Sequence, residues 1–166
     1  VVDDRSTDTT AAQVESNRKQ HTNLKLIRIA EAPTGMAPKK HAILEGIKKA
    51  KNEIIVLTDA DCRVQPSWLE TIDKYMTDKV GLIQGVTSYR SVPKINPLLL
   101  GFQSVDFFSH TVVSAAAIGA NLPLNSNANN LAFRKKVFNE IGGYGDEKSV
   151  ISGDDDLLLQ KIWRSD

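Results

Sequence analysis

Short apolar runs alternate along this chain with longer segments in which apolar residues recur at helical spacing. Residues 54–57 are continuously apolar, a pattern typical of a strand that is buried on both faces. Ile43, Leu44 and Ile47, by contrast, lie at the three- and four-residue spacing of an amphipathic helix. The alternation of the two patterns predicts an α/β domain in which helices cover a sheet.

The same patterns predict the remaining elements. Pro66 fits the opening of a helix, where its fixed φ and missing N–H are tolerated. Gly142 and Gly143 end another helix, because glycine is favoured just past a helix C-terminus. The predicted strands are residues 1–2 (a strand end), 24–29, 54–57, 80–86 and 130–133. Three predicted helices start near Asp8, Pro38 and Pro66, and three more comprise residues 98–116, 135–141 and 157–162. The predicted connections are residues 93–97 and 121–130.

Composition narrows the classes of protein to which the sequence can belong. Its 166 residues are enough for one domain with a sizeable core. The 21 Lys and Arg residues nearly balance the 20 Asp and Glu residues, so the net charge of +1 gives no electrostatic argument for nucleic-acid binding. Cys62 is the one cysteine, which rules out an internal disulfide and favours a reducing compartment.

The sequence contains no segment typical of a transmembrane helix or a signal peptide. The nearest candidate, residues 107–133, lacks Lys, Arg, Asp and Glu, but His110, several Ser and Asn residues and Pro123 interrupt it. The sequence opens on VVDD, the pattern of a strand end, with no initiator Met. We therefore expect the chain to be a piece of a longer protein.

A pair of aspartates directly after the apolar run is the sharpest chemical feature. Asp59 and Asp61 follow residues 54–57, and on an extended chain alternate side chains point the same way. Open α/β sheets bind ligands beyond the carboxyl ends of their strands. Two carboxylates there suit a hard divalent cation, which would neutralise a diphosphate. The alternative is an ordinary loop, because such a pair also arises by chance.

Two other acidic stretches lie next to predicted helices. Asp3 and Asp4 either accept hydrogen bonds from a nucleobase or ribose or simply cap a turn. Asp154 and Asp155 belong to a run of three carboxylates, which either provides a base for an acceptor hydroxyl or caps the last helix. Lys39 opens a lysine pair near a predicted helix start, where it either meets a phosphate or forms part of a solvated face.

Taken together, five stretches resemble family 2 glycosyltransferases of the GT-A fold. Each motif is short, but the five follow one another in the family's order over nearly the whole chain. The stretches are VVDDRSTDTT (1–10), which resembles VVDDGSTDGT; KKHAI (39–43), which resembles K-x-x-A-L; IVLTDADC (55–62), which resembles the strand and metal motif; NLAFR (130–134) with Phe138 and IGGY (141–144), which resemble N-x-A-F-R…F…GGF; and GDDDLL (153–158), which resembles G-E-D-x-x-L.

The resemblance implies a GT-A type, Rossmann-like α/β fold with a mixed, mainly parallel sheet flanked by helices and truncated at its N-terminus. Residues 1–61 would form the nucleotide-sugar-binding half, and residues 62–166 the half that holds the acceptor and the base. The family's first strand would precede Val1, so we expect this stretch alone to be inactive. A cytoplasmic location at the cytoplasmic face of a membrane is implied as well, with membrane contact only through segments outside this chain.

The resemblance further implies a reaction and a role for each candidate residue. A sugar would pass with inversion from a nucleotide-sugar, expected to be a UDP-sugar, to a hydroxyl of a saccharide or lipid-linked acceptor, as in polysaccharide biosynthesis. The implied roles are uridine binding for Asp3 and Asp4, diphosphate contact for Lys39, ribose or metal contact for Asp59, Mg²⁺ or Mn²⁺ binding for Asp61, and general base for Asp155, with Asp154 as its neighbouring candidate.

The chain departs from the family motifs at two positions, and two other functions compete. Arg5 stands in place of Gly, and Asp154 in place of Glu, which leaves the base between Asp154 and Asp155. A haloacid-dehalogenase-type phosphohydrolase would use Asp59 as its nucleophile, but Arg63 stands where that motif has Thr or Val. The non-enzymatic alternative is a nucleotide-sugar-binding module without turnover. A phosphoenzyme at Asp59 would favour the first alternative, and binding without transfer the second.

Overall fold

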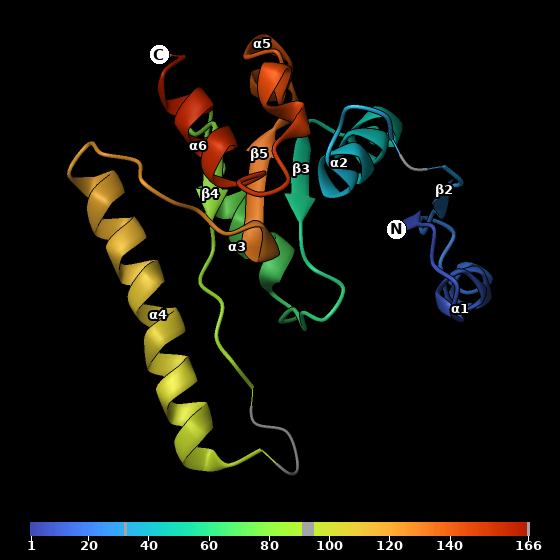
Figure 1. Cartoon of the computed structure of the whole chain (residues 1–166), viewed down its shortest axis with the longest axis horizontal. Coiled ribbons are helices and arrows are strands. Elements are labelled where there is room, and N and C mark those ends of the chain that lie inside the picture. The colour runs from blue at the N-terminus through green and yellow to red at the C-terminus, as the bar shows by residue number, and fades with distance from the viewer. Residues whose placement is uncertain (32, 91–94, 166) are drawn as a thin grey trace. The chain divides into compact units, whose positions relative to one another are not determined.

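The computed structural model describes residues 1–31, 33–90 and 95–165, and these fold into two compact units (Figure 1). Unit 1 comprises Val1–Glu53 and Tyr144–Asp154, and unit 2 comprises Ile54–Gly143 and Asp155–Asp166. The predicted functional division after residue 61 stays a prediction, because the units are defined by packing alone. The predicted connection 93–97 lies partly outside the described residues.

Unit 1 is built on a parallel pair of strands. Val2 lies opposite Ile27, and Asp4 lies opposite Ile29, with one helix as the crossover that parallel pairing needs. A second helix packs against the first strand, so closely that a Cβ on Gly46 would lie 3.3 Å from the Val2 side chain. The elements are β1 (Val2–Asp4), α1 (Thr10–Arg18), β2 (Ile27–Ile29), α2 (Pro38–Lys49) and the 3-10 helix η2 (Gly145–Ser149).

Unit 2 is built on a three-stranded sheet in the order β3–β5–β4. In the middle strand, Ala132 lies opposite Val56 of β3 on one side and Ile83 of β4 on the other, and both pairings are antiparallel. β3 and β4 therefore run in the same direction. The elements are β3 (Ile54–Leu57), α3 (Trp68–Tyr75), β4 (Leu82–Gln84), α4 (Pro97–Gly119), the 3-10 helix η1 (Ala128–Asn130), β5 (Leu131–Arg134), α5 (Lys135–Glu140) and α6 (Asp156–Trp163).

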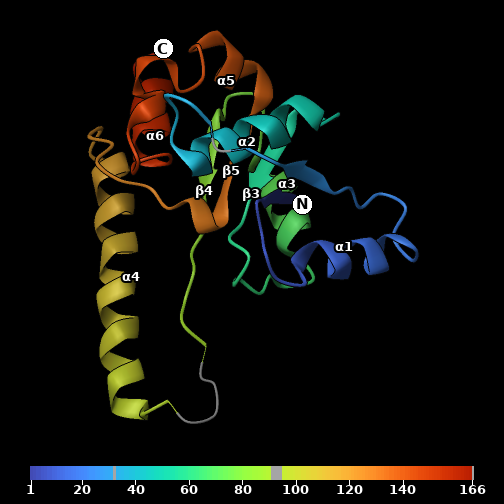
Figure 2. The same cartoon turned by 45° about the vertical axis from the view of Figure 1, so that its right-hand side comes forward.

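Helices pack on both faces of this sheet. Its three strands lie side by side in both views (Figure 1 and Figure 2). On one face, Ile72 of α3 and Met76, which directly follows that helix, form a buried cluster with Ala132. Because side chains alternate along a strand, the next residue of β5 points to the other face. There Phe133, which is 0% exposed, stacks on Phe138 of α5 with ring centroids 5.4 Å apart. The core of unit 2 is thus centred on β5.

The predicted α/β class is confirmed, but the strand pairing is more mixed than expected. β3 is found at the predicted residues 54–57, whereas the predicted strands 24–29 and 80–86 shorten to β2 and β4. The parallel pair belongs to unit 1, and the sheet of unit 2 is antiparallel. The reason is that β5 enters between β3 and β4 in the opposite direction, a non-local pairing that hydrophobic patterns do not encode.

The longest helix, α4, leaves most of its apolar side chains exposed. Leu98, Phe102 and Val105 each expose between 68% and 72% of their surface. Burial is confined to Ser114 and Ala117 near its C-terminal end, where Ser114 Oγ donates to Gln84 Oε1 of β4 at 3.2 Å. Among the helices in the described part of the chain, none has both the length and the hydropathy needed to cross a membrane.

Candidate functional site

Asp59 and Asp61 lie in the turn that follows β3. The strand ends at Leu57, and the N–H of Cys62 donates to the Asp59 carbonyl at 3.1 Å. The pair is therefore on a turn rather than on extended chain, and the argument from alternating side chains does not apply to it. Asp61 is exposed to solvent, and Asp59 is half-buried. The structure thus places Asp61 where a ligand can reach it.

This aspartate pair supplies hard oxygen donors of the kind that a divalent cation prefers. Mg²⁺ is usually bound through one or two carboxylates together with substrate phosphates, rather than by an all-protein cage. Within residues 1–31, 33–90 and 95–165, no group of three or more His, Cys, Asp or Glu side chains is gathered as such a cage would require. Two carboxylates alone do not complete the coordination of such a cation, so the remaining ligands would have to come from water or a bound substrate.

Asp3 and Asp4, at the end of β1, are held in different ways. Asp3 is 3% exposed and accepts a hydrogen bond from the Ser6 N–H at 3.0 Å, so its carboxylate shapes the turn after the strand. Asp4 is half-buried and pairs with Arg5 Nε at 2.8 Å. This hydrogen bond lowers the pKa of Asp4. Asp4 is therefore a half-buried carboxylate whose two oxygens both accept hydrogen bonds from the Arg5 guanidinium.

Arg5 itself has a φ of 59°, in the left-handed region where glycine is favoured. The motif VVDDGSTDGT has Gly at this position, and Gly adopts this conformation without strain. This chain has Arg5 there instead. The side chain of Arg5 adds what a glycine cannot, namely the ion pair with Asp4.

Unit 1 joins two of the predicted site residues directly. Lys39 Nζ, at the start of α2, lies 3.1 Å from Oδ2 of Asp154. The lysine side chain is 49% exposed, and the aspartate side chain is 8% exposed. The candidate for the diphosphate contact is thus an ion-pair partner of one candidate for the base.

Lys40 is a structural residue that sequence reasoning missed. Its side chain is 0% exposed, and its Nζ donates to the carbonyl of Glu147 at 2.8 Å and to that of Ser152 at 3.5 Å. The same Nζ lies 5.4 Å from the centroid of the Tyr144 ring. Lysine is almost never fully buried without partners. Because Lys40 follows Lys39, the sequence is compatible with a solvated pair of lysines. No signal in the sequence distinguishes the buried lysine from the exposed one.

Asp155, the other candidate for the base, is the N-cap residue of α6. Its Oδ1 accepts from the N–H of Asp156 at 2.9 Å, and its Oδ2 accepts from the N–H of Ala128 at 2.8 Å. Asp156 is anchored as well, because its Oδ1 accepts from the Ser126 N–H at 2.6 Å. The half-buried carboxylate of Asp155 is therefore fixed in direction.

The predicted site residues fall into two sets, one on each unit. Unit 1 holds Asp3, Asp4, Lys39 and Asp154, and unit 2 holds Asp59, Asp61 and Asp155.

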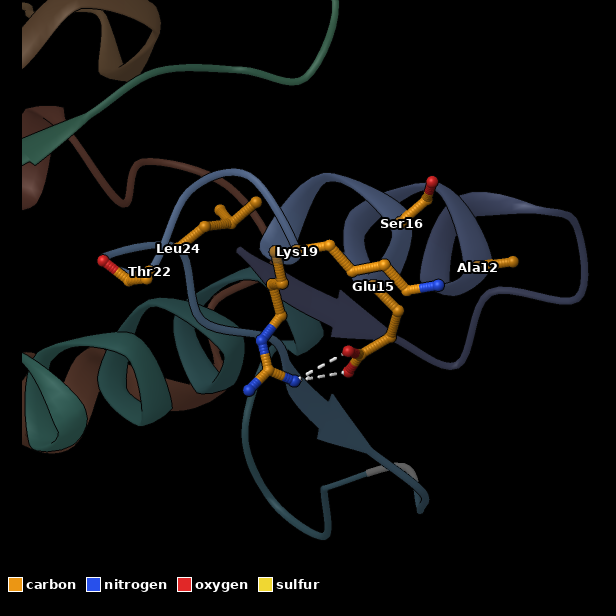
Figure 3. A pocket seen from close by; sticks show the side chains of 7 residues that line it. Ala12, Glu15, Ser16, Lys19, Thr22 and Leu24 are labelled. Carbon is orange, nitrogen blue, oxygen red and sulfur yellow. Dashed lines mark hydrogen bonds and ion pairs between the residues drawn. The ribbon is translucent and has the colours of Figure 1, made fainter.

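A pocket of about 700 Å³ lies beside α1, in unit 1 (Figure 3). At its edge Arg18 Nη1 donates to the Glu15 carboxylate at 2.7 Å. No predicted site residue lines this pocket, so it adds nothing to the candidate site. The lining residues are Ala12, Glu15, Ser16, Arg18, Lys19, Thr22 and Leu24.

Comparison with known proteins decides the family. The model of glycosyl transferase family 21 matches residues 3–165. The chain belongs to glycosyl transferase family 21. The resemblance to a GT-A-like glycosyltransferase is thereby confirmed; the model that matches is that of family 21, and the expected family 2 is not confirmed. Among curated proteins, none matches the sequence.

A solved structure gives this family 21 chain a structural relative. The chain is similar to the mannosyltransferase PcManGT from Pyrobaculum calidifontis, whose structure is in complex with GDP-Man and Mn²⁺, with 26% sequence identity and a TM-score of 0.67. The match covers 98% of this chain and 41% of that one. This chain thus spans about two fifths of the length of that mannosyltransferase.

Proposed function

We propose that this family 21 chain carries the donor-binding and catalytic residues of a glycosyltransferase. The reaction transfers a sugar from a nucleoside diphosphate sugar to a hydroxyl of an acceptor. The observation that carries the proposal is the family match over residues 3–165, because it spans every candidate site residue. The mannosyltransferase relative supports the class of donor, since its structure contains a nucleotide-sugar and a divalent cation.

Asp155 is the general base of the proposed reaction. Asp154 is engaged by Lys39 in an ion pair, whereas Asp155 is held only by backbone N–H groups among its described hydrogen bonds and keeps lone pairs for a hydroxyl. The Asp155 carboxylate takes the proton of the acceptor hydroxyl as that oxygen bonds to C1 of the sugar. The bond from C1 to the phosphate oxygen breaks in line, and its electron pair leaves with the nucleoside diphosphate. A single displacement of this kind inverts the anomeric centre.

Four of the candidate residues have proposed contacts with the donor or its cation. Asp4 would accept hydrogen bonds from the nucleoside, and Lys39, which is half exposed, would contact the diphosphate. Asp61 and Asp59 would hold a divalent cation together with the phosphate oxygens. When bound, the cation supplies positive charge that stabilises the leaving diphosphate.

GDP-mannose is the first donor to test. The mannosyltransferase relative binds GDP-Man, and this supports a guanosine diphosphate sugar. A UDP-sugar, which the resemblance to family 2 implies, is the second donor to test. The two donors differ in the nucleobase and, unless the second also carries mannose, in the sugar, whereas the proposed displacement at C1 is the same.

Release of nucleoside diphosphate by the intact protein, with Mn²⁺ and either GDP-mannose or a UDP-sugar, tests the proposal. General base catalysis contributes about 10²- to 10⁴-fold in rate, so we expect Asp155→Asn to lower kcat by about that factor. The matched control is Asp146→Asn, an exposed aspartate of η2, which is expected to keep the wild-type rate. Turnover of Asp155→Asn within about twofold of wild type would contradict the assignment of the base.

A further inference from the structure

A turn far away in the sequence orients the carboxylate of Asp155. Oδ1 accepts from the N–H of the next residue, Asp156, a bond made within the turn that opens α6. Oδ2 accepts from the N–H of Ala128, which is 27 residues away in sequence. Ala128 opens the 3-10 helix η1 and is 3% exposed. The position of this one interior N–H therefore sets the direction in which the carboxylate points.

Asn130, the last residue of η1, ties the turn to two other elements of unit 2. Its Oδ1 accepts from Nε1 of Trp68 in α3 at 2.9 Å. Its Nδ2 donates to the carbonyl of Val86, just after β4, at 3.1 Å. Its backbone carbonyl accepts from the N–H of Gly85 at 2.7 Å. Three hydrogen bonds on one residue thus fasten η1 to α3 and to the end of β4.

Gly85 makes room for this amide. A Cβ atom on Gly85 would overlap the side chain of Asn130, so the two residues are fitted to each other. The neighbouring residues add a further hydrogen bond, in which Thr87 Oγ1 donates to Asn129 Oδ1 at 2.9 Å. Hydrogen bonds of this kind restrict the backbone around η1 to one arrangement.

We propose that Asn130 is a positioning residue for the transfer reaction, which acts through η1 on the Ala128 N–H and so on the Asp155 carboxylate. This inference rests on the proposed role of Asp155 as the general base. The amide of Asn130 is itself engaged by Trp68 and Val86, so its effect on the reaction passes through the turn and not through the substrate.

The direction of the carboxylate matters because a base must lie within hydrogen-bond reach of the proton that it removes. A displacement of about 1 Å costs on the order of 100-fold in rate. Donor binding is assigned to other residues, namely those of unit 1 and the aspartate pair after β3. Loss of the Asn130 side chain should therefore appear in kcat and not in the donor KM.

Steady-state kinetics of the intact protein provide the first test. We expect Asn130→Ala to lower kcat about tenfold or more and to leave the donor KM within about twofold of wild type. Trp68→Phe keeps an aromatic ring and removes the Nε1 donor, so a smaller loss of kcat in the same direction is expected. The matched control is Asn139→Ala, at an exposed position of α5, which is expected to keep the wild-type kcat. A raised donor KM with unchanged kcat in Asn130→Ala would overturn the proposal.

A double-mutant cycle asks whether Asn130 acts through Asp155. Residues that act as one unit give strongly non-additive effects. In the Asp155→Asn background, we therefore expect Asn130→Ala to change the remaining rate by less than about twofold. Additive losses of rate would show that Asn130 acts elsewhere, and they too would overturn the proposal.

Amide hydrogen exchange separates this inference from the proposed function, because it needs no activity. We expect the Ala128 N–H to exchange at least about tenfold faster in Asn130→Ala or Trp68→Phe, while the Ile141 N–H, bonded to the Val137 carbonyl in α5, keeps its protection. Unchanged exchange at Ala128 in both variants overturns the inference. Full turnover by Asp155→Asn would instead contradict the base assignment, whatever Ala128 does.

Discussion

Asp4 and Arg5 show how one side chain changes the chemistry of its neighbour at the end of β1. Arg5 takes up a left-handed φ, which costs an L-residue about 1–2 kcal/mol, and its guanidinium pairs with Asp4 at 2.8 Å. The hydrogen bond from Arg5 is the largest cause of the lowered pKa of Asp4. The proposed nucleoside contact is therefore ionised over the whole neutral range.

The titration of Asp4 follows from this contact. A carboxylate whose pKa is lower in the folded than in the unfolded state stabilises the fold above the unfolded pKa, and this contribution is lost as the pH falls through the folded pKa. We expect NMR titration to give Asp4 a pKa below that of an ordinary aspartate. Arg5→Gly, which restores the residue type of the motif, should raise it toward the ordinary value, because the donor is gone. Equal midpoints in the two proteins would contradict the assigned cause.

The sequence predicts the candidate residues better than it predicts their contacts. Asp59 and Asp61 were expected just beyond a buried strand, and β3 does end at Leu57, but the turn that carries them was not foreseen. The contact between Lys39 and Asp154 joins positions more than 100 residues apart, which no local pattern encodes. The burial of Lys40 has the same origin, since its partners come from the distant segment 144–154.

At the scale of elements, Lys40 fastens the segment before Asp154 to the start of α2. Its Nζ donates to the carbonyls of Glu147 and Ser152 and lies over the ring of Tyr144, and these groups stabilise its charge. The Ala37 N–H adds a backbone bond to the Lys148 carbonyl at 2.8 Å. The segment that leads to Asp154 is thereby anchored in unit 1.

Lys40→Met tests this anchor, because Met is similar in length and carries no donor. A buried acceptor left without its partner costs about 1–3 kcal/mol, so we expect unit 1 to lose about 2 kcal/mol of stability. The measurement is hydrogen exchange of the Ala37 N–H, which should become faster as the segment loosens. Lys48→Met, at an exposed position of α2, is the control. Unchanged protection of Ala37 in Lys40→Met would show that the anchor lies elsewhere.

Elements themselves were predicted well where a single local property decides them. A continuous apolar run gave β3, and Pro38 marked the first residue of α2. The helix expected near Asp8 begins two residues later, as α1 at Thr10, whose N–H donates to Asp8 Oδ1 at 2.9 Å. The antiparallel entry of β5 was not predicted, because strand order is set by packing between distant segments and not by hydrophobic alternation.

At the scale of the whole molecule, the two sets of site residues belong to different units. Nucleoside and diphosphate contacts are proposed for unit 1, and the cation and base residues for unit 2. The family match extends over both units, from residue 3 to residue 165. The proposed reaction therefore requires that the nucleotide-sugar binds together with its cation.

A calorimetric titration of the protein with GDP-mannose, and separately with a UDP-sugar, tests this requirement most directly. With Mn²⁺ present, we expect saturable binding of at least one donor. Removal of the cation with EDTA, or the substitution Asp61→Asn, should weaken that binding by at least about tenfold, equal to about 1.4 kcal/mol. Asp73→Asn, at an exposed position of α3, should bind like wild type. Failure of both donors to bind with Mn²⁺ present, or binding indifferent to both the cation and Asp61, would contradict the account.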